Sequence, residues 1–307
     1  MDARITKQRL GNMLSYDWLK ILLTIAIAAL FFGMFFTMIG ARPTYGQTFY
    51  VYAFDGLSTG GHFGTLGSDM ENKSVFGYDI LKTGSESFTS GGLYGGTVYN
   101  SRRSAGEGRV LFIRDVRTTD DKGNVSSDLL NFLDYEGTSV EQFRFCIDPQ
   151  KFLQDCREYL EPFFGEDLTG EINNEQARAT FLARNGKDAR FRTSSKKEKG
   201  VNNEVERLKK IRDDYLFVIS QMGQTIDYVT YTTEIKTHYI GFSMKQLNLT
   251  PLVYYIEEEE GEKRQTNSEI ALCIYNNNER EGDLKYESVN FIAYLLRRYG
   301  PEVESKA

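Results

Sequence analysis

Hydrophobic positions are concentrated near the start of the chain. Between Lys20 and Arg42 lie twenty-one residues without a charge, ILLTIAIAALFFGMFFTMIGA, and the sequence beyond them is long and mostly polar. A helix of that length rises about 1.5 Å per residue and spans roughly the 30 Å hydrocarbon core of a bilayer. The pattern predicts three parts: a cytoplasmic tail over residues 1–18, a transmembrane signal anchor over residues 19–41 and an extracytoplasmic α/β domain over residues 42–307.

The flanking charges predict the orientation of this anchor. Arg4, Lys7, Arg9 and Lys20 precede the uncharged run, and close behind it there is only Arg42. Because positive residues favour the cytoplasmic side, the N-terminus is expected in the cytoplasm and the large domain outside the cell membrane. A cleaved signal peptide is the alternative interpretation, although its apolar region is usually only about 7–15 residues long.

The first part of the predicted domain alternates between apolar strands and Gly-rich connections. Aromatic and β-branched residues predict a first strand over residues 48–54, and an unbroken apolar run predicts a buried strand over residues 109–116. A weaker strand is predicted over residues 75–81 and a short helix over residues 127–135. The Gly- and Ser-rich segments 55–67 and 84–96 are predicted to be loops.

The middle of the chain has helical periodicity. Apolar residues recur every three or four positions over residues 149–164 and 204–222, and a helical pattern over residues 173–184 ends at Asn185-Gly186. Residues 187–200 are basic and lack apolar periodicity, so this segment is predicted to be an exposed loop.

The last part returns to strands and ends in a helix. Strands are predicted over residues 225–233, 234–242, 252–256 and 269–275, with an exposed acidic connection over residues 257–268. Residues 284–299 carry an apolar stripe and end before Gly300-Pro301, which predicts a final helix. Strands mixed with helices indicate the α/β class.

Net charge argues against one class of partner. The chain carries a formal charge of −6, and no basic stretch interleaved with aromatic residues offers a nucleic-acid surface. The sequence therefore predicts no nucleic-acid partner. Acidic residues dilute a local group of five arginines, which we interpret as a solvated face; it comprises Arg102, Arg103, Arg109, Arg114 and Arg117.

The three cysteines do not form a disulfide framework by themselves. Cys146, Cys156 and Cys273 are an odd number, so they cannot all pair within one chain. Each lies in an apolar segment, which favours buried free thiols. A Cys146–Cys156 bridge is the alternative.

No catalytic, cofactor-binding or metal-binding residue can be selected from the sequence. The two histidines, His62 and His238, are far apart, and there is neither a CxxC nor an HExxH motif. The Gly-rich segment 91–96 lacks the Lys-Ser/Thr of a phosphate loop. Acidic pairs such as Asp213–Asp214 are interpreted as the solvent side of a helix. The prediction is a protein that is not an enzyme.

One resemblance rests on the C-terminal part. The strand EIALCIY is followed by an Asn-rich turn and the helix LKYESVNFIAYLL, in which Tyr286, Val289, Ile292 and Leu295–Leu296 hold the apolar positions. This arrangement is similar to the end of extracellular solute-binding proteins, and the first strand and the segment GEGRVLFIRDV also resemble that family. The resemblance implies a two-lobed periplasmic-binding-like fold.

Two functional classes follow from these observations. The first is a membrane-anchored extracytoplasmic binding or accessory protein associated with an ABC-type uptake transporter. Its partners would be the membrane, a transporter permease and a small-molecule solute. The second is an extracytoplasmic interaction or structural protein without a small ligand. A membrane-anchored hydrolase is a third alternative, for which the sequence offers no catalytic set.

Overall fold

The computed structural model describes ten stretches of the 307-residue chain: residues 7–39, 43–54, 56–88, 97–98, 101–102, 107–135, 146–232, 236–259, 261–276 and 282–301. The chain divides into two units, Met1–Arg42 and Pro43–Ala307. The Gly-rich segment 91–96 and Arg103 lie outside the described residues.

The uncharged run lies within one helix, α1 (Lys7–Ile39). The window Trp18–Phe35 has a mean hydropathy of 2.1, and none of it is buried. This helix is long and apolar enough to cross a membrane, a property that membrane anchors and signal sequences share. The predicted helix is therefore confirmed, and its role in a membrane is consistent with the structure.

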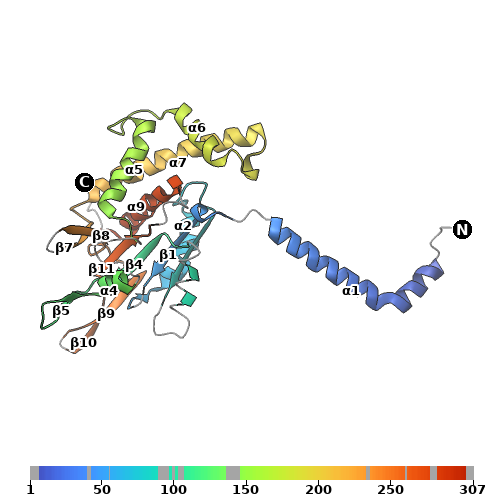
Figure 1. Ribbon diagram of the computed structural model, residues 1–307, viewed down its shortest axis with the longest axis horizontal. Coiled ribbons are helices and arrows are strands. Elements are labelled where there is room, and N and C mark those ends of the chain that lie inside the picture. The colour runs from blue at the N-terminus through green and yellow to red at the C-terminus, as the bar shows by residue number, and fades with distance from the viewer. Residues whose placement is uncertain are drawn as a thin grey trace, which may run out of the picture. The chain divides into compact units, whose positions relative to one another are not determined.

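A six-stranded sheet organises the second unit, in the order β3-β1-β4-β11-β8-β7 (Figure 1). Its strands are β1 (Thr48–Ala53), β3 (Lys82–Ser87), β4 (Val110–Arg114), β7 (Asp227–Thr232), β8 (Thr237–Ser243) and β11 (Ile270–Ile274). Strands β3 and β4 run parallel to β1, whereas β11, β8 and β7 continue the sheet in antiparallel fashion. The structure is thus mixed α/β, as expected.

The central strands are buried on both faces. In β1, Phe49 and Val51 enter one apolar cluster, and the alternate residues Tyr50 and Tyr52 enter another. Strands β4 and β11 divide their side chains between the same two clusters. Such two-sided burial explains why these strands read as continuous apolar runs.

Helices cover the two faces unequally. Four helices supply most of the helical residues of the larger cluster, and a single short helix supplies those of the smaller one. The four are α2 (Gly61–Asn72), α5 (Pro149–Phe164), α7 (Ser194–Gln221) and α9 (Glu287–Tyr299), and the short one is α4 (Asp128–Tyr135). Helix α6 (Asn174–Asn185) packs on α5 and α7. These helices confirm the periodicity-based predictions for residues 127–135, 149–164, 173–184, 204–222 and 284–299, with shifted ends for most of them.

Short elements complete the chain. A second sheet has the order β10-β9-β2, and β5 pairs with β6. The remaining elements are η1 (Tyr45–Gln47), β2 (Ser58–Thr59), β5 (Thr118–Thr119), β6 (Val125–Ser126), η2 (Ala189–Phe191), β9 (Val253–Glu259), β10 (Glu262–Thr266) and η3 (Gly282–Tyr286). The first turn of the predicted helix 284–299 is therefore the end of the 3-10 helix η3.

The strand predicted over residues 75–81 is wrong. The strand that follows in this region is β3, KTGSES, which pairs with β1. It begins at Lys82, one residue after the predicted strand ends. Val75 is apolar because it packs into the larger cluster, not because it belongs to the sheet. Gly84 occupies β3 because a Cβ there would lie 2.5 Å from the ring of Tyr50. Packing at this site therefore overrides strand propensity.

The loop predicted over residues 55–67 is wrong in its second half. Helix α2 begins at Gly61 despite its glycines, and Phe63, Leu66 and Met70 form its buried face. Gly67 lets the helix approach β3 closely, because a Cβ there would lie 3.0 Å from the Cα of Gly84. The glycines that suggested a loop thus permit helix–strand contact.

The loop predicted over residues 187–200 is also wrong in part. Helix α7 begins at Ser194, where the hydroxyl of Thr193 accepts a hydrogen bond from the Lys196 N–H at 3.3 Å. The exposed first turns of α7 carry lysines, so they show little apolar periodicity. Capping and the contact of Gly200 with Phe181 determine the helix there.

The acidic connection predicted over residues 257–268 is instead largely a hairpin. β9 extends to Glu259, and β10 pairs with it so that Lys263 faces Glu258 and Arg264 faces Glu257. Opposite charges on facing positions stabilise an exposed two-stranded pair. Two residues of the acidic run, Glu257 and Glu258, therefore face cations across the hairpin.

Residues Pro43–Ala307 form one compact unit around the six-stranded sheet. The structure does not confirm the expected two-lobed periplasmic-binding architecture. What it shows is a mixed α/β fold preceded by one apolar helix.

Candidate functional site

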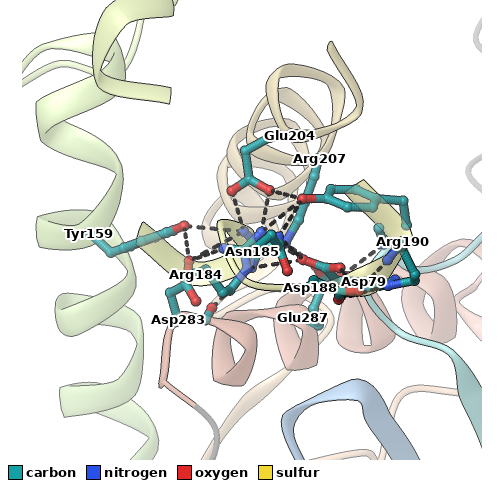
Figure 2. Close-up of polar contacts among 12 residues, drawn as sticks. Asp79, Tyr159, Arg184, Asn185, Asp188, Arg190, Glu204, Arg207, Asp283 and Glu287 are labelled. Carbon is teal, nitrogen blue, oxygen red and sulfur yellow. Dashed lines mark hydrogen bonds and ion pairs between the residues drawn. The ribbon is translucent and has the colours of Figure 1, made fainter. Parts of the chain in front are cut away.

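Charged side chains of the described residues gather in a buried ion network among the helices (Figure 2). We define the buried ion network as Asp79, Arg184, Asp188, Arg190, Glu204, Arg207, Asp283 and Glu287. Its members come from the segment before β3, from α6, from the segment before α7, and from α7, η3 and α9. These members fall in four regions of the sequence, at Asp79 and within residues 184–190, 204–207 and 283–287.

Arg207 lies at the centre of this network and has no exposed side-chain surface. Its Nε donates to Glu287 at 2.6 Å, and its Nη1 donates to Glu204 at 3.1 Å. A third contact, from Nη2, reaches the carbonyl oxygen of Asp283 at 3.0 Å. Gly77 packs so closely on Arg207 that a Cβ at that position would lie 2.7 Å from its Cγ. The backbone before β3 is therefore fitted to this arginine.

Arg184 and Arg190 complete the network around Asp79. The buried Asp79 carboxylate accepts hydrogen bonds from Arg190 at 2.8 Å and from Arg184 and Asn185 at 3.0 Å each. Arg184 also contacts Glu204 and Asp283. Burial by itself would raise the pKa of Asp79, but the arginines and Asn185 outweigh burial and lower it.

The network holds three arginines and five carboxylates, and neutral donors bind the additional carboxylate oxygens. The hydroxyl of Tyr78 donates to Glu204 at 2.9 Å and that of Tyr159 to Asp283 at 3.1 Å. Asn290 donates to Glu287 at 2.7 Å. Because these groups bind one another, we assign the network a structural role in holding the helices to the sheet.

Sequence reasoning missed this network. The available signal was Glu204 and Arg207, one helical turn apart, on the face of α7 that also carries the apolar stripe. Charged residues on the buried side of a helix are rare unless they are paired. Their partners, however, are distant in sequence: Glu287 lies 80 residues from Arg207, and Tyr78 lies 126 residues from Glu204. Only folding brings them together.

The structure corrects two interpretations of charged residues. Asp213 is exposed, but Asp214 is buried and paired with Lys210 and Arg297, so the pair is not a solvated face. Among the grouped arginines, Arg109 is buried and donates to the carbonyl oxygens of Gly46 and Thr48. The prediction of a solvated arginine face is therefore wrong for Arg109.

The remaining candidate residues are dispersed. His62 is exposed on α2, and His238 is buried on β8. All three cysteines are free and buried, so the preferred interpretation is confirmed and a Cys146–Cys156 bridge is absent. Within the described residues, no group of three or more His, Cys, Asp or Glu side chains is arranged to hold a metal ion.

The described part of the chain also forms a polar cleft of about 730 Å³. We define the polar cleft by its lining residues, which are Asp115–Arg117, Gly223–Thr230, Ser243, Lys245, Gln246 and Glu269. Asp115 follows β4 directly, Glu269 precedes β11, and Ser243 ends β8. The cleft therefore lies along the sheet edge at the carboxyl end of the parallel strand β4, where open α/β sheets commonly bind ligands.

One wall of the polar cleft is fixed by hydrogen bonds. The buried carboxylate of Asp115 accepts from the hydroxyl of Ser127 at 2.6 Å and from Arg117 at 2.8 Å. Arg117 also donates to the carbonyl oxygen of Thr230 at 2.7 Å, which joins β7 to the segment after β4. These hydrogen bonds hold this wall together without a ligand.

The cleft lining also carries further polar side chains. Within the described residues, the side chains of Gln224, Lys245 and Glu269 make no hydrogen bond or ion pair. The lining also includes Tyr228, whose ring packs edge-on against Tyr239 at 5.3 Å. Burial raises the pKa of Tyr228, so its hydroxyl stays protonated at neutral pH. The cleft thus presents an ammonium, a carboxylate, amides and an aromatic ring to solvent.

Comparison of the chain with protein families, curated proteins and solved structures found no match. The interpretation of the polar cleft therefore rests on its own geometry and chemistry.

Proposed function

We propose that this protein is a membrane-anchored extracytoplasmic binding protein whose polar cleft holds a small polar solute. The observation that carries the proposal is the cleft itself, whose ammonium, carboxylate and amide groups at the carboxyl edge of the sheet bind none of the described residues. Its volume falls within the range of about 300–1,000 Å³ that is usual for small-molecule sites. Charges of both signs in the lining suit a zwitterionic or polyhydroxylated solute.

The apolar helix α1 gives the proposal its location. On this proposal α1 is an uncleaved anchor, with the N-terminus in the cytoplasm and the α/β unit outside. A tethered binding protein meets a transporter at high effective concentration, so modest affinity for the permease suffices. The resemblance to extracellular solute-binding proteins supports an ABC-type uptake transporter as the partner, and a two-lobed arrangement would belong to the same proposal.

Isothermal titration calorimetry on the full chain in non-ionic detergent tests the cleft. The probes are glutamate, arginine, glycine betaine and glucose. A charged hydrogen bond contributes about 1.5–3 kcal/mol, so Lys245→Gln or Glu269→Gln is expected to weaken binding of the active probe at least about tenfold. Lys263→Gln in β10 is the matched control. Unchanged affinity in both cleft variants would contradict the assignment.

A pull-down of the tagged chain from detergent extracts tests the partner. Recovery of a transporter permease, together with impaired uptake of one nutrient class after deletion of the gene, is the expected result. Recovery of a different membrane protein, with no binding of any small probe, would favour the interaction protein without a ligand. Turnover of a peptide or polymer substrate would favour the hydrolase.

A further inference from the structure

A second hollow, of about 250 Å³, lies where α7 packs on α9. We define this basic hollow by its lining residues, Lys73, Val75, Lys210, Asn290, Tyr294, Arg297 and Arg298. Lys73 stands at the end of α2, and the two arginines lie in the last turn of α9. Four of the seven lining residues are cations, contributed by three helices and their ends.

The positive charge of the basic hollow is only partly compensated. Asp214, which is buried on α7, pairs with Arg297 at 2.6 Å and with Lys210 at 3.2 Å. Within the described residues, Lys73 and Arg298 make no ion pair. The carboxyl ends of α2 and α9 each add roughly half a negative charge. Burial raises the pKa of Tyr294 and Tyr299, and the negative charge of Asp69, which also reaches this region, raises it further. A net positive charge remains.

One of the lining residues also carries a buried polar atom without a hydrogen-bond partner among the described residues. Asn290 is 1% exposed, and its Oδ1 makes no hydrogen bond within the described residues. The Nδ2 of the same amide donates to Glu287, which fixes the amide with Oδ1 as an acceptor. The hydroxyl of Tyr294 is buried too and makes no regular hydrogen bond, although it interacts with Tyr299. An unsatisfied buried amide oxygen costs about 1–3 kcal/mol.

These two observations define the ligand chemistry. The cations require an anion with several acceptor oxygens, and Asn290 requires a hydrogen-bond donor on the same molecule. A single water would satisfy Asn290 but would leave the positive charge uncompensated. The small volume limits the bound part to the size of a headgroup. A phosphate carried by a small polyol meets all of these conditions.

We propose that the basic hollow binds the phosphate group of a glycerol-phosphate-like molecule. Lys73 and Arg298, which make no ion pair with the described residues, bind the phosphate oxygens, and Asn290 Oδ1 accepts a hydrogen bond from a hydroxyl of the polyol. The same chemistry occurs in free sn-glycerol 3-phosphate, a monoester, and in the phosphatidylglycerol headgroup, a diester. The site is separate from the polar cleft and independent of the function proposed for it.

Titration calorimetry of the full chain in non-ionic detergent tests this site with four probes. These are inorganic phosphate, sn-glycerol 3-phosphate, soluble dihexanoyl-phosphatidylglycerol and glycerol. We expect sn-glycerol 3-phosphate or the short-chain lipid to bind more tightly than inorganic phosphate, and glycerol not to bind. Preference for the monoester identifies a free solute, whereas preference for the diester identifies a lipid headgroup.

Exposed substitutions then assign the binding to the basic hollow. Lys73→Gln and Arg298→Gln are each expected to lower the affinity for the preferred probe at least about tenfold, and Lys263→Gln is expected to leave that affinity unchanged. Asn290→Leu should abolish the preference over inorganic phosphate, in a variant whose circular dichroism shows a retained fold. Absence of binding of every phosphate probe at millimolar concentration, or binding that both cation variants retain, would overturn the proposal.

Discussion

At the residue scale, the buried ion network shows how charge is accommodated in the interior. Arg207 has no exposed side-chain surface, yet each of its nitrogens finds an oxygen on Glu204, Glu287, Tyr159 or Asp283. Burial lowers the pKa of an arginine, but Tyr159 and the carboxylates raise that of Arg207 by more. Removing one partner of such a group leaves an uncompensated buried charge, which costs far more than the intact pair contributes.

Asp79→Asn is the sharpest test of this network. The variant keeps the shape of the side chain but faces Arg184 and Arg190 without a charge, so we expect a loss of about 3–5 kcal/mol in the free energy of unfolding. Asp188→Asn is expected to cost much less, because this side chain is 21% exposed and its partner among the described residues is Arg190. Urea denaturation followed by circular dichroism measures both. Equal losses would contradict the central role of Asp79.

The lowered pKa of Asp79 predicts a pH dependence with a definite sign. The folded state holds the carboxylate ionised to a lower pH than the unfolded chain, whose Asp pKa is about 3.9. The stability from Asp79 is therefore fully present above the unfolded-state pKa and is lost as the pH falls through the folded-state pKa. Between about pH 4 and pH 2, the Asp79→Asn variant should therefore lose less stability than the parent chain. A slope identical to that of the parent chain would exclude this contribution.

At the element scale, amphipathic helices pack one face on the sheet. Helix α9 buries Val289, Ile292 and Leu295, and α7 crosses it with Leu208 and Ile211 in the same apolar cluster. The end of α9 turns Arg297 and Arg298 outward, where cations suit the helix dipole. One helix thus supplies both core residues and the lining of the basic hollow.

Substitutions on α7 and α9 test whether buried apolar positions matter more for folding than exposed ones. Ile292 has no exposed surface, so Ile292→Asp buries an unpaired charge and is expected to unfold or aggregate the α/β unit. Leu216, which is 41% exposed on α7, is the control, and Leu216→Asp should stay within about 1 kcal/mol of the parent. Size-exclusion chromatography and thermal denaturation distinguish the two. A folded Ile292→Asp protein would show that α9 does not pack as described.

At the scale of the whole molecule, the chain combines an apolar helix with a separate α/β unit. The proposed function requires α1 to remain in the membrane with the α/β unit outside. None of the apolar window Trp18–Phe35 of α1 is buried in the structure. Exposed apolar surface of this kind is unfavourable in water and suits a bilayer. Membrane insertion is therefore the property on which localisation depends.

Charges placed within α1 test insertion directly. Leu23→Arg and Ala28→Arg each cost roughly 2.5–3.5 kcal/mol near a helix centre on insertion scales, so the double variant is expected in the soluble fraction. Protease added to spheroplasts should degrade a C-terminal tag on the parent chain and spare one at Met1. Protection of the C-terminal tag would reverse the proposed orientation.

The sequence by itself determined the features that depend on local pattern. It located the apolar helix, the buried strands β1, β4 and β11, and the amphipathic faces of α5, α7 and α9, because each of these patterns lies within one short segment. It also predicted the buried free thiols correctly. It could not indicate the polar cleft, whose lining comes from segments separated by more than 100 residues.

Tertiary structure decided everything that depends on contacts between distant segments. The polar strand β3 and the Gly-rich helix α2 formed because they pack on each other and on β1, against their intrinsic preferences. Glu204, Asp214 and Arg109 appear in sequence as ordinary surface charges, yet each is buried beside partners that only the fold supplies. Propensity describes a residue's own backbone, whereas burial and ion pairing are properties of the residues that the folded chain places around it.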